Sequence, residues 1–140
     1  MFSRRIRGFT LVEVMLVVII IGILAAIAIP AFRKTIERTN GDRAVVNLKV
    51  IRAAQKMYRI DQNTYWGTGS LTNSDLDTGH YLQNPNIEWP ITFAYTVTAA
   101  DVTTFTARAT RNSGPFNGGW IQINHNGVFV TGGGWPFTYP

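Results

Sequence analysis

The sequence lacks cysteine altogether, which excludes disulfide bonds, thiolate metal sites and a cysteine nucleophile. Histidine is nearly absent as well. His80 and His125 lie far apart, each in a predicted turn, so we expect surface residues and not metal ligands. No HExxH, GxSxG or phosphate-binding loop occurs, and the glycine run 132–134 is not followed by lysine. With no catalytic constellation present, we predict no enzyme and no cofactor, and we assign no residue to a metal site.

A dense basic block is lacking beyond the first eight residues. The formal net charge is +5, and three of the positive charges are Arg4, Arg5 and Arg7. Because a nucleic-acid interface needs a basic patch or stripe on the folded domain, we expect no direct contact with nucleic acid.

Close pairs of acidic residues are also rare, and Asp75 with Asp77 is the exception. The segment 73–77, Asn-Ser-Asp-Leu-Asp, has the alternating oxygen spacing of a calcium loop, but it has no acidic residue twelve positions along. The spacing leaves calcium binding in the exported part of the chain open.

What the chain does contain is one long apolar run. Phe9–Phe32 comprises 24 residues with a single charge, Glu13. A helix of that length spans about 36 Å, against about 30 Å for the hydrocarbon core of a bilayer. The preceding arginines should stay in the cytoplasm, so we predict one membrane span over 9–32 with residues 33–140 exported.

Three interpretations fit this segment at first. One is a secretory signal peptide cut near Ala26-Ile27-Ala28, the second is a plain anchor, and the third is a signal cut at the start of the run. Glu13 favours the third, because a carboxylate within the hydrocarbon costs about 3 kcal/mol unless it has a partner.

The stretch 8–18, Gly-Phe-Thr-Leu-Val-Glu-Val-Met-Leu-Val-Val, closely resembles the signal of type IV prepilins and pseudopilins. The resemblance covers residues 4–32, since the rest of the apolar run is similar to the anchoring helix of that family. The resemblance implies cleavage between Gly8 and Phe9 and N-methylation of Phe9. It also implies that Glu13 pairs with the Phe9 amine of an adjacent subunit and so sets the filament register. A residue without Cβ at Gly8 suits an extended backbone in a peptidase site.

Two residues interrupt the predicted membrane helix. Pro30 has no N–H and its ring clashes with the preceding turn, so we expect a kink there. By analogy with the family, the section from Gly22 to Pro30 would melt and stretch during assembly.

After the apolar run, residues 33–60 predict an amphipathic helix. One face would be buried and the opposite surface charged. Gly41 weakens the helix by roughly 1 kcal/mol relative to Ala and would allow a bend. The buried face comprises Ile36, Ala44, Val45, Leu48, Ile51, Ala54, Gln55 and Tyr58, and the charged surface Arg38, Asp42, Lys49, Arg52, Lys56 and Arg59.

The remainder predicts a loop and a small sheet. Residues 61–86 form the loop, which Tyr65, Trp66, Leu71, Leu76, Tyr81 and Leu82 should hold against the head. Alternating runs at 91–98, 103–110, 119–124 and 128–131 predict three or four antiparallel strands. Asn126-Gly127 predicts a hairpin turn because both residues tolerate positive φ. Trp135, Phe137 and Tyr139 should fold back on the head, and burial in the core is the expected use of Trp66, Trp120 and Trp135.

We therefore predict an α+β, pilin-like fold, in which a long N-terminal helix packs on a small antiparallel sheet. The expected organisation is a leader peptide (1–8), a membrane and polymerisation helix (9–32), the helical half of the head (33–60) and a loop and sheet (61–140). The N-terminus would be cytoplasmic and the head outside the inner membrane.

The resemblance implies a filament subunit of a type IV pilus, a type II secretion pseudopilus or a DNA-uptake filament. Its partners would be copies of itself, minor pilins or pseudopilins, the prepilin peptidase and the inner-membrane assembly platform. Major pilins often close the C-terminal region with a disulfide, which this chain cannot form. Secretion pseudopilins often lack cysteine, but their C-terminal calcium-loop pattern is not evident here. A membrane-tethered binding module that does not polymerise is the alternative.

Overall fold

The computed structural model describes residues 8–67, 69–70, 81–82 and 92–140. The chain forms two compact units, residues 1–37 and 38–140, which are considered separately below.

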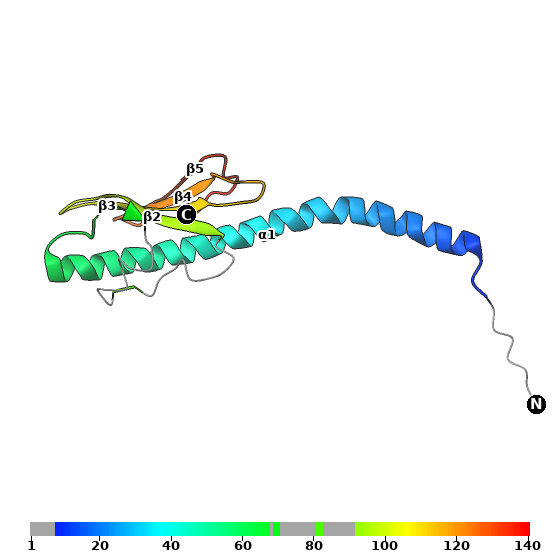
Figure 1. Ribbon diagram of the computed structural model, residues 1–140, viewed down its shortest axis with the longest axis horizontal. Helices are drawn as coiled ribbons and strands as arrows, with labels where there is room; N and C mark the ends of the chain where they lie inside the picture. The colour runs from blue at the N-terminus through cyan, green and yellow to red at the C-terminus, as the bar shows by residue number, and fades with distance from the viewer. Residues whose placement is uncertain (1–7, 68, 71–80, 83–91) are drawn as a thin grey trace, which may run out of the picture. The chain divides into compact units, whose positions relative to one another are not determined.

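The first unit is the N-terminal part of a single long helix. Helix α1 runs from Leu11 to Gln62, 52 residues, and continues without interruption through Gly22 and Pro30 (Figure 1). In this unit the large apolar side chains are exposed, with exposed fractions between 78% for Phe9 and 42% for Ile36. The helix is long and apolar enough to cross a membrane. The expected helix is confirmed, whereas the kink at Pro30 stays a prediction.

The second unit carries a five-stranded antiparallel sheet in which neighbours in sequence are neighbours in space (Figure 1). The sheet order is β1-β2-β3-β4-β5, which is a simple meander. Its strands are β1 (Gly69–Ser70), β2 (Phe93–Ala100), β3 (Phe105–Arg111), β4 (Trp120–Asn124) and β5 (Phe129–Gly132).

Four of these strands match the predicted alternating runs to within two residues. The short β1, which pairs with β2, lies in the segment for which the sequence predicts only a loop. A two-residue strand has no detectable alternation, so no periodic signal could have revealed it. The register of β2 against β3 shifts between Val97 and Ala99, and this bulge carries β2 beyond its predicted end at residue 98.

The β4–β5 hairpin is confirmed, but its turn differs from the prediction. Gly127 has a φ of 91°, whereas Asn126 is not among the positive-φ residues. The Gly127 N–H donates to the Asn124 carbonyl at 2.9 Å, and the Asn124 N–H donates to the Val128 carbonyl at 3.2 Å. The loop therefore has three residues and ends in a left-handed glycine, so only one of the two predicted residues needs positive φ.

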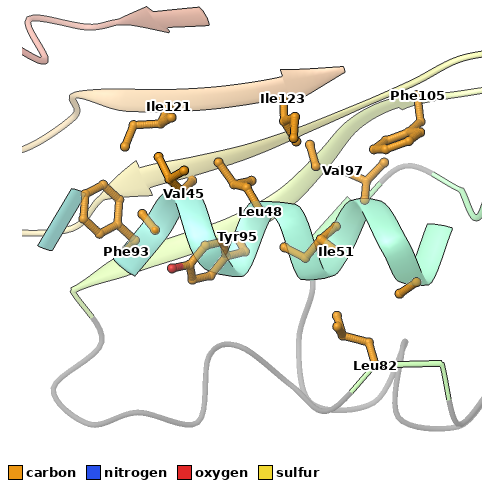
Figure 2. Packing of buried hydrophobic residues seen from close by; sticks show 14 of the residues in the cluster. Val45, Leu48, Ile51, Leu82, Phe93, Tyr95, Val97, Phe105, Ile121 and Ile123 are labelled. Carbon is orange, nitrogen blue, oxygen red and sulfur yellow. The ribbon is translucent and has the colours of Figure 1, made fainter. Parts of the chain in front are cut away.

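The core lies between one face of α1 and one face of the sheet (Figure 2). Leu48 and Ile51 of α1 are fully buried, as are Phe105 of β3 and Ile121 of β4. The buried residues of α1 lie three or four positions apart, and buried residues alternate with more exposed ones along β3 and β4, as predicted. Ile36, expected on the buried face, is 42% exposed, so that expectation is wrong.

Two polar residues of α1 fasten the head. Gln55 is 1% exposed, and its amide accepts from the Trp66 N–H at 2.8 Å and donates to the Trp66 carbonyl at 3.3 Å. Arg52, predicted to be solvated, is half-buried and donates through Nε to the His125 carbonyl at 3.0 Å. These hydrogen bonds satisfy backbone groups of Trp66 and His125, which lie outside the strands of the sheet.

The C-terminal tail folds back on the head, as predicted. Trp135 is 6% exposed, and its ring lies 5.3 Å from Phe93 and 5.8 Å from Phe116 between centroids. Gly41 of α1 is buried, and a Cβ there would meet the Tyr139 hydroxyl and lie 2.6 Å from Cζ2 of Trp135. The helix continues through Gly41, so this glycine provides room for the tail and no break in α1.

We expect Gly41→Ala to destabilise the head by about 1–3 kcal/mol, because the added methyl overpacks the contact with Trp135 and Tyr139. Helix propensity alone would predict a gain of roughly 1 kcal/mol, so the sign of the effect distinguishes the two forces. Thermal unfolding of the purified full chain in detergent measures it. Gly67→Ala is the control, since nothing lies within 4 Å of a Cβ at Gly67. A stabilised Gly41→Ala variant would contradict the tail contact.

The β2–β3 turn is organised by Asp101. Its Oδ1 accepts from the backbone N–H groups of Thr103 and Thr104, both at 2.6 Å, and from the Thr103 hydroxyl at 2.9 Å. The backbone bonds from Thr104 and Thr103 hold the pKa of Asp101 well below its ordinary value of 3.8. A carboxyl with a lowered folded pKa stabilises the fold above its unfolded pKa, and this contribution is lost as the pH falls through the folded value.

We therefore expect Asp101→Asn to lower the Tm of the head at pH 7 by a few degrees. The difference from the unmodified protein should shrink as the pH is lowered below about 4, where the unfolded aspartate protonates. Melting curves between pH 7 and pH 2 test this. Asp42→Asn, at an exposed position of α1, removes a carboxylate outside the turn and serves as the control. An equal difference at all pH values would mean that the charge is irrelevant to the turn.

Candidate functional site

The start of α1 is the place where the predicted site residues come together. Thr10 precedes the helix, and its hydroxyl accepts from the Glu13 N–H at 3.3 Å. In return, Glu13 Oε2 accepts from the Thr10 N–H at 3.0 Å and from its hydroxyl at 2.9 Å. This reciprocal arrangement is a capping box, which satisfies two backbone donors that a helix start leaves open.

The cap has a chemical consequence for Glu13. Both described bonds of its carboxylate use Oε2, so Oε1 retains its capacity to accept from another donor. Phe9, exposed at 78%, directly precedes the capping residue, and Gly8 is exposed next to it. The peptide bond between Gly8 and Phe9 is therefore outside the helix and accessible, while Glu13 lies in the first turn of α1.

The other predicted sites lie farther along α1 or outside the described residues. A Cβ added at Gly22 would meet no atom within 4 Å, so the glycine there makes room for no contact within this unit. His125 lies in the β4–β5 turn, where its carbonyl accepts from Arg52. His80, Leu71, Leu76 and the candidate calcium segment 73–77 lie outside the described residues.

Ligand-binding features are sparse in the part of the chain that the structure describes. No group of three His, Asp or Glu residues gathers there to hold a metal ion. Trp135 is in the core, as expected, and Trp66 is partly buried and packs against the core. Trp120 instead lies on the outer sheet face, where the Arg108 guanidinium is 4.3 Å from its ring centroid, so core burial was the wrong expectation for this residue.

Sequence reasoning missed two features of α1. Thr10 was not singled out, although Thr-x-x-Glu before an apolar run is the signature of a capping box. The helix surface opposite the core was predicted to be charged, but it also carries exposed apolar side chains, among them Val46 at 58% and Met57 at 55%. Exposed apolar residues recur at positions 46, 50, 53, 57 and 60, in steps of four and three residues, and this spacing was the signal that could have revealed them.

Comparison with known proteins identifies the same N-terminal segment. Residues 3–29 match the prokaryotic N-terminal methylation motif. The chain is 52% identical over 64 residues to the type IV major pilin protein PilA of Myxococcus xanthus, a match that covers 46% of this chain and 29% of that pilin.

Two relatives belong to secretion systems. The chain is 40% identical over 102 residues to the type II secretion system core protein G of Aeromonas hydrophila, covering 64% of this chain and 71% of the relative. It is 38% identical over 64 residues to core protein G of Pectobacterium carotovorum, covering 46% of this chain and 41% of the relative. The chain thus spans less than half of two of these three relatives.

Three observations point to the same family: the methylation motif, the long apolar helix and the match over 71% of the Aeromonas protein. The chain belongs to the family of type IV pilins and type II secretion pseudopilins, which are structural filament subunits anchored in the inner membrane by the N-terminal helix.

Proposed function

We propose that this chain is the precursor of a filament subunit that is cut between Gly8 and Phe9, methylated on Phe9 and polymerised through the first half of α1. The observation that carries the proposal is Glu13, which lies at the capped start of α1 and is the single charge in the exposed apolar run 9–32. Cleavage would place a new ammonium on Phe9, one residue before the cap. No catalytic role follows for any residue.

The proposed register contact joins Phe9 of one copy to Glu13 of the next. In an apolar bundle each charge alone is costly, so the two charges stabilise the assembly only when they meet. Glu13 Oε1 is the acceptor for the neighbouring ammonium, while Oε2 keeps the Thr10 cap of its own helix. One axial stagger of neighbouring helices satisfies all the copies at once.

The relatives favour a type II secretion pseudopilus over a pilus. Both matches extend beyond the apolar run, but the match to the Aeromonas core protein G covers 64% of the chain and 71% of that relative, whereas the match to the Myxococcus pilin covers 46% of the chain and 29% of that pilin. The lack of cysteine points the same way. The further partners are minor pseudopilins, the prepilin peptidase and the inner-membrane assembly platform, and the head would face the periplasm.

The first test is the N-terminal mass of the protein purified from its native membrane. We expect a chain that starts at Phe9 and carries one additional methyl group. An intact Met1 start would make the segment a plain anchor, and a start near Ala28 would make the protein a secreted one. Either result would refute the filament function.

The second test removes the charge at the register contact. Glu13→Gln keeps a side-chain oxygen for the Thr10 cap but leaves the neighbouring ammonium unpaired, at a cost of about 3 kcal/mol or more per contact. We expect cleavage at Phe9 and the melting temperature of the head to be unchanged, while filaments counted by electron microscopy fall at least tenfold. Filaments in wild-type number would show that the Glu13 charge does not set the register.

A further inference from the structure

The sheet has an inner face, which packs on α1, and an outer face on the opposite side (Figure 2). Along β2, β3 and β4, buried residues of the inner face alternate with less buried residues of the outer face. Among the outward positions of these three strands, Arg108 of β3 is the one charged residue. The outer face therefore presents a single positive charge within an uncharged surface that is mostly polar.

Arg108 is held in one orientation. Its Nε and Nη2 both donate to Oε1 of Gln122, at 3.2 and 2.9 Å, and Gln122 is its cross-strand partner on β4. Its guanidinium carbon lies 4.3 Å from the centroid of the Trp120 ring. Because fixing a long side chain costs conformational entropy, an arginine with two such supports is unusual on an open surface.

Two glycines fix the Trp120 ring in turn. A Cβ at Gly132 would meet Cζ2 of Trp120, and a Cβ at Gly133 would lie 2.9 Å from its Cδ1. The indole thus fills the space that two side chains would otherwise occupy. Since this platform is built from the chain itself, the guanidinium is oriented before any ligand arrives, which lowers the entropic cost of binding.

The guanidinium keeps one edge free. The bonds to Gln122 use the Nε edge, so the edge formed by Nη1 and Nη2 retains donors, and no carboxylate among the described residues pairs with Arg108. Two parallel N–H donors match the two oxygens of a carboxylate. Thr96, the partner of Arg108 on β2, and Thr110, on the same face of β3, add hydroxyl donors nearby.

We propose that Arg108 is the centre of a carboxylate-binding site on the outer face of the head, with Thr96 and Thr110 as further donors. The occupant is an Asp or Glu side chain of a partner protein, presented by an uncharged polar surface. One arginine in neutral surroundings is complementary to one carboxylate in neutral surroundings. A flat face covers little of a free carboxylate, whereas a protein surface would also cover the threonines around Arg108.

The acidic residues of the head favour a different protein over a second copy of this chain. Asp61 accepts from the Tyr81 hydroxyl at 2.8 Å, and Asp101 binds the backbone of its own turn. Asp42 is followed directly by Arg43, whose charge would repel Arg108. The site lies within the second unit, so the inference does not depend on the proposed filament function.

The first experiment titrates the nitrogen-15-labelled full-length protein in detergent micelles with sodium acetate. We expect saturable NMR shifts at the Arg108 Nε–H and at the amides of Thr96 and Thr110, with a dissociation constant of about 10–100 mM. Sodium chloride and the neutral analogue acetamide are the controls and should give no saturable shift. Arg108→Met keeps an apolar stem against Trp120, so its Tm should be unchanged while the response to acetate is lost.

Three outcomes of the titration would overturn the site. These are a missing response to acetate, an equal response to acetamide, and an Arg108→Met variant that still responds like the unmodified protein. If acetate gave no response and Arg108→Met lowered the Tm by several degrees, the arginine would serve only to cover Trp120.

The second experiment identifies the occupant. With benzoylphenylalanine at Ala94, which pairs with Thr110 on the outer face, we expect crosslinking in the native cells to a different protein through a peptide that contains Asp or Glu. The crosslink should fall at least tenfold in Arg108→Met and in Arg108→Glu, and changing the partner's carboxylate to lysine should restore it in Arg108→Glu. The same probe at Val102, exposed at 60% in the β2–β3 turn, is the control.

The assigned occupant would be wrong if the Ala94 probe captured only lipid, only a second copy of this chain or nothing. It would also be wrong if Arg108→Met left the crosslink unchanged, or if the exchange of charges failed to restore it. A saturable response to acetate together with any of these results would mean a carboxylate site with another source of ligand.

Discussion

The apolar surface that α1 cannot bury within one chain is the constraint on which the rest of the structure depends. In its first unit the helix exposes apolar side chains all round. In its second unit one face packs on the sheet, while Val46, Met57 and Ile60 stay exposed. Apolar area removed from water contributes about 25 cal/mol per Å², so such a helix requires lipid, further copies or both. Filament assembly is the outcome that satisfies this requirement for every copy.

The head is built to hold one side of α1 firmly without covalent links. A meander sheet presents its inner face to the helix, and the tail closes over Gly41, where the missing Cβ allows Trp135 to approach. Gln55 and Arg52 bind backbone groups on either side of the core, so these groups need no water to satisfy them. A chain without cysteine thus relies on aromatic packing and backbone-directed hydrogen bonds for its stability.

At the N-terminus Glu13 completes the Thr10 cap through one carboxylate oxygen. In the proposed register contact, the charge of the same side chain would give the apolar helix a unique axial position. Apolar contacts are non-directional and tolerate sliding, whereas an ion pair in a low dielectric does not. In the proposed filament, apolar contacts between helices would supply the buried area and the Glu13 contact would supply the register.

The local sequence was sufficient for the membrane helix, the pilin-like α+β class and the four long strands, because each depends on periodicity or on unbroken apolar length. The motif that holds Gly8, Phe9 and Glu13 was also visible in the sequence because it is short and local, whereas the roles assigned to these three residues stay predictions. Only the tertiary structure revealed that Gly41 accommodates the tail, that Arg52 binds the hairpin turn, that β1 pairs with β2 and that Trp120 lies on the outer sheet face. These features depend on which distant segments meet, and in a head with a single helix face and a twisted sheet no local pattern encodes that pairing.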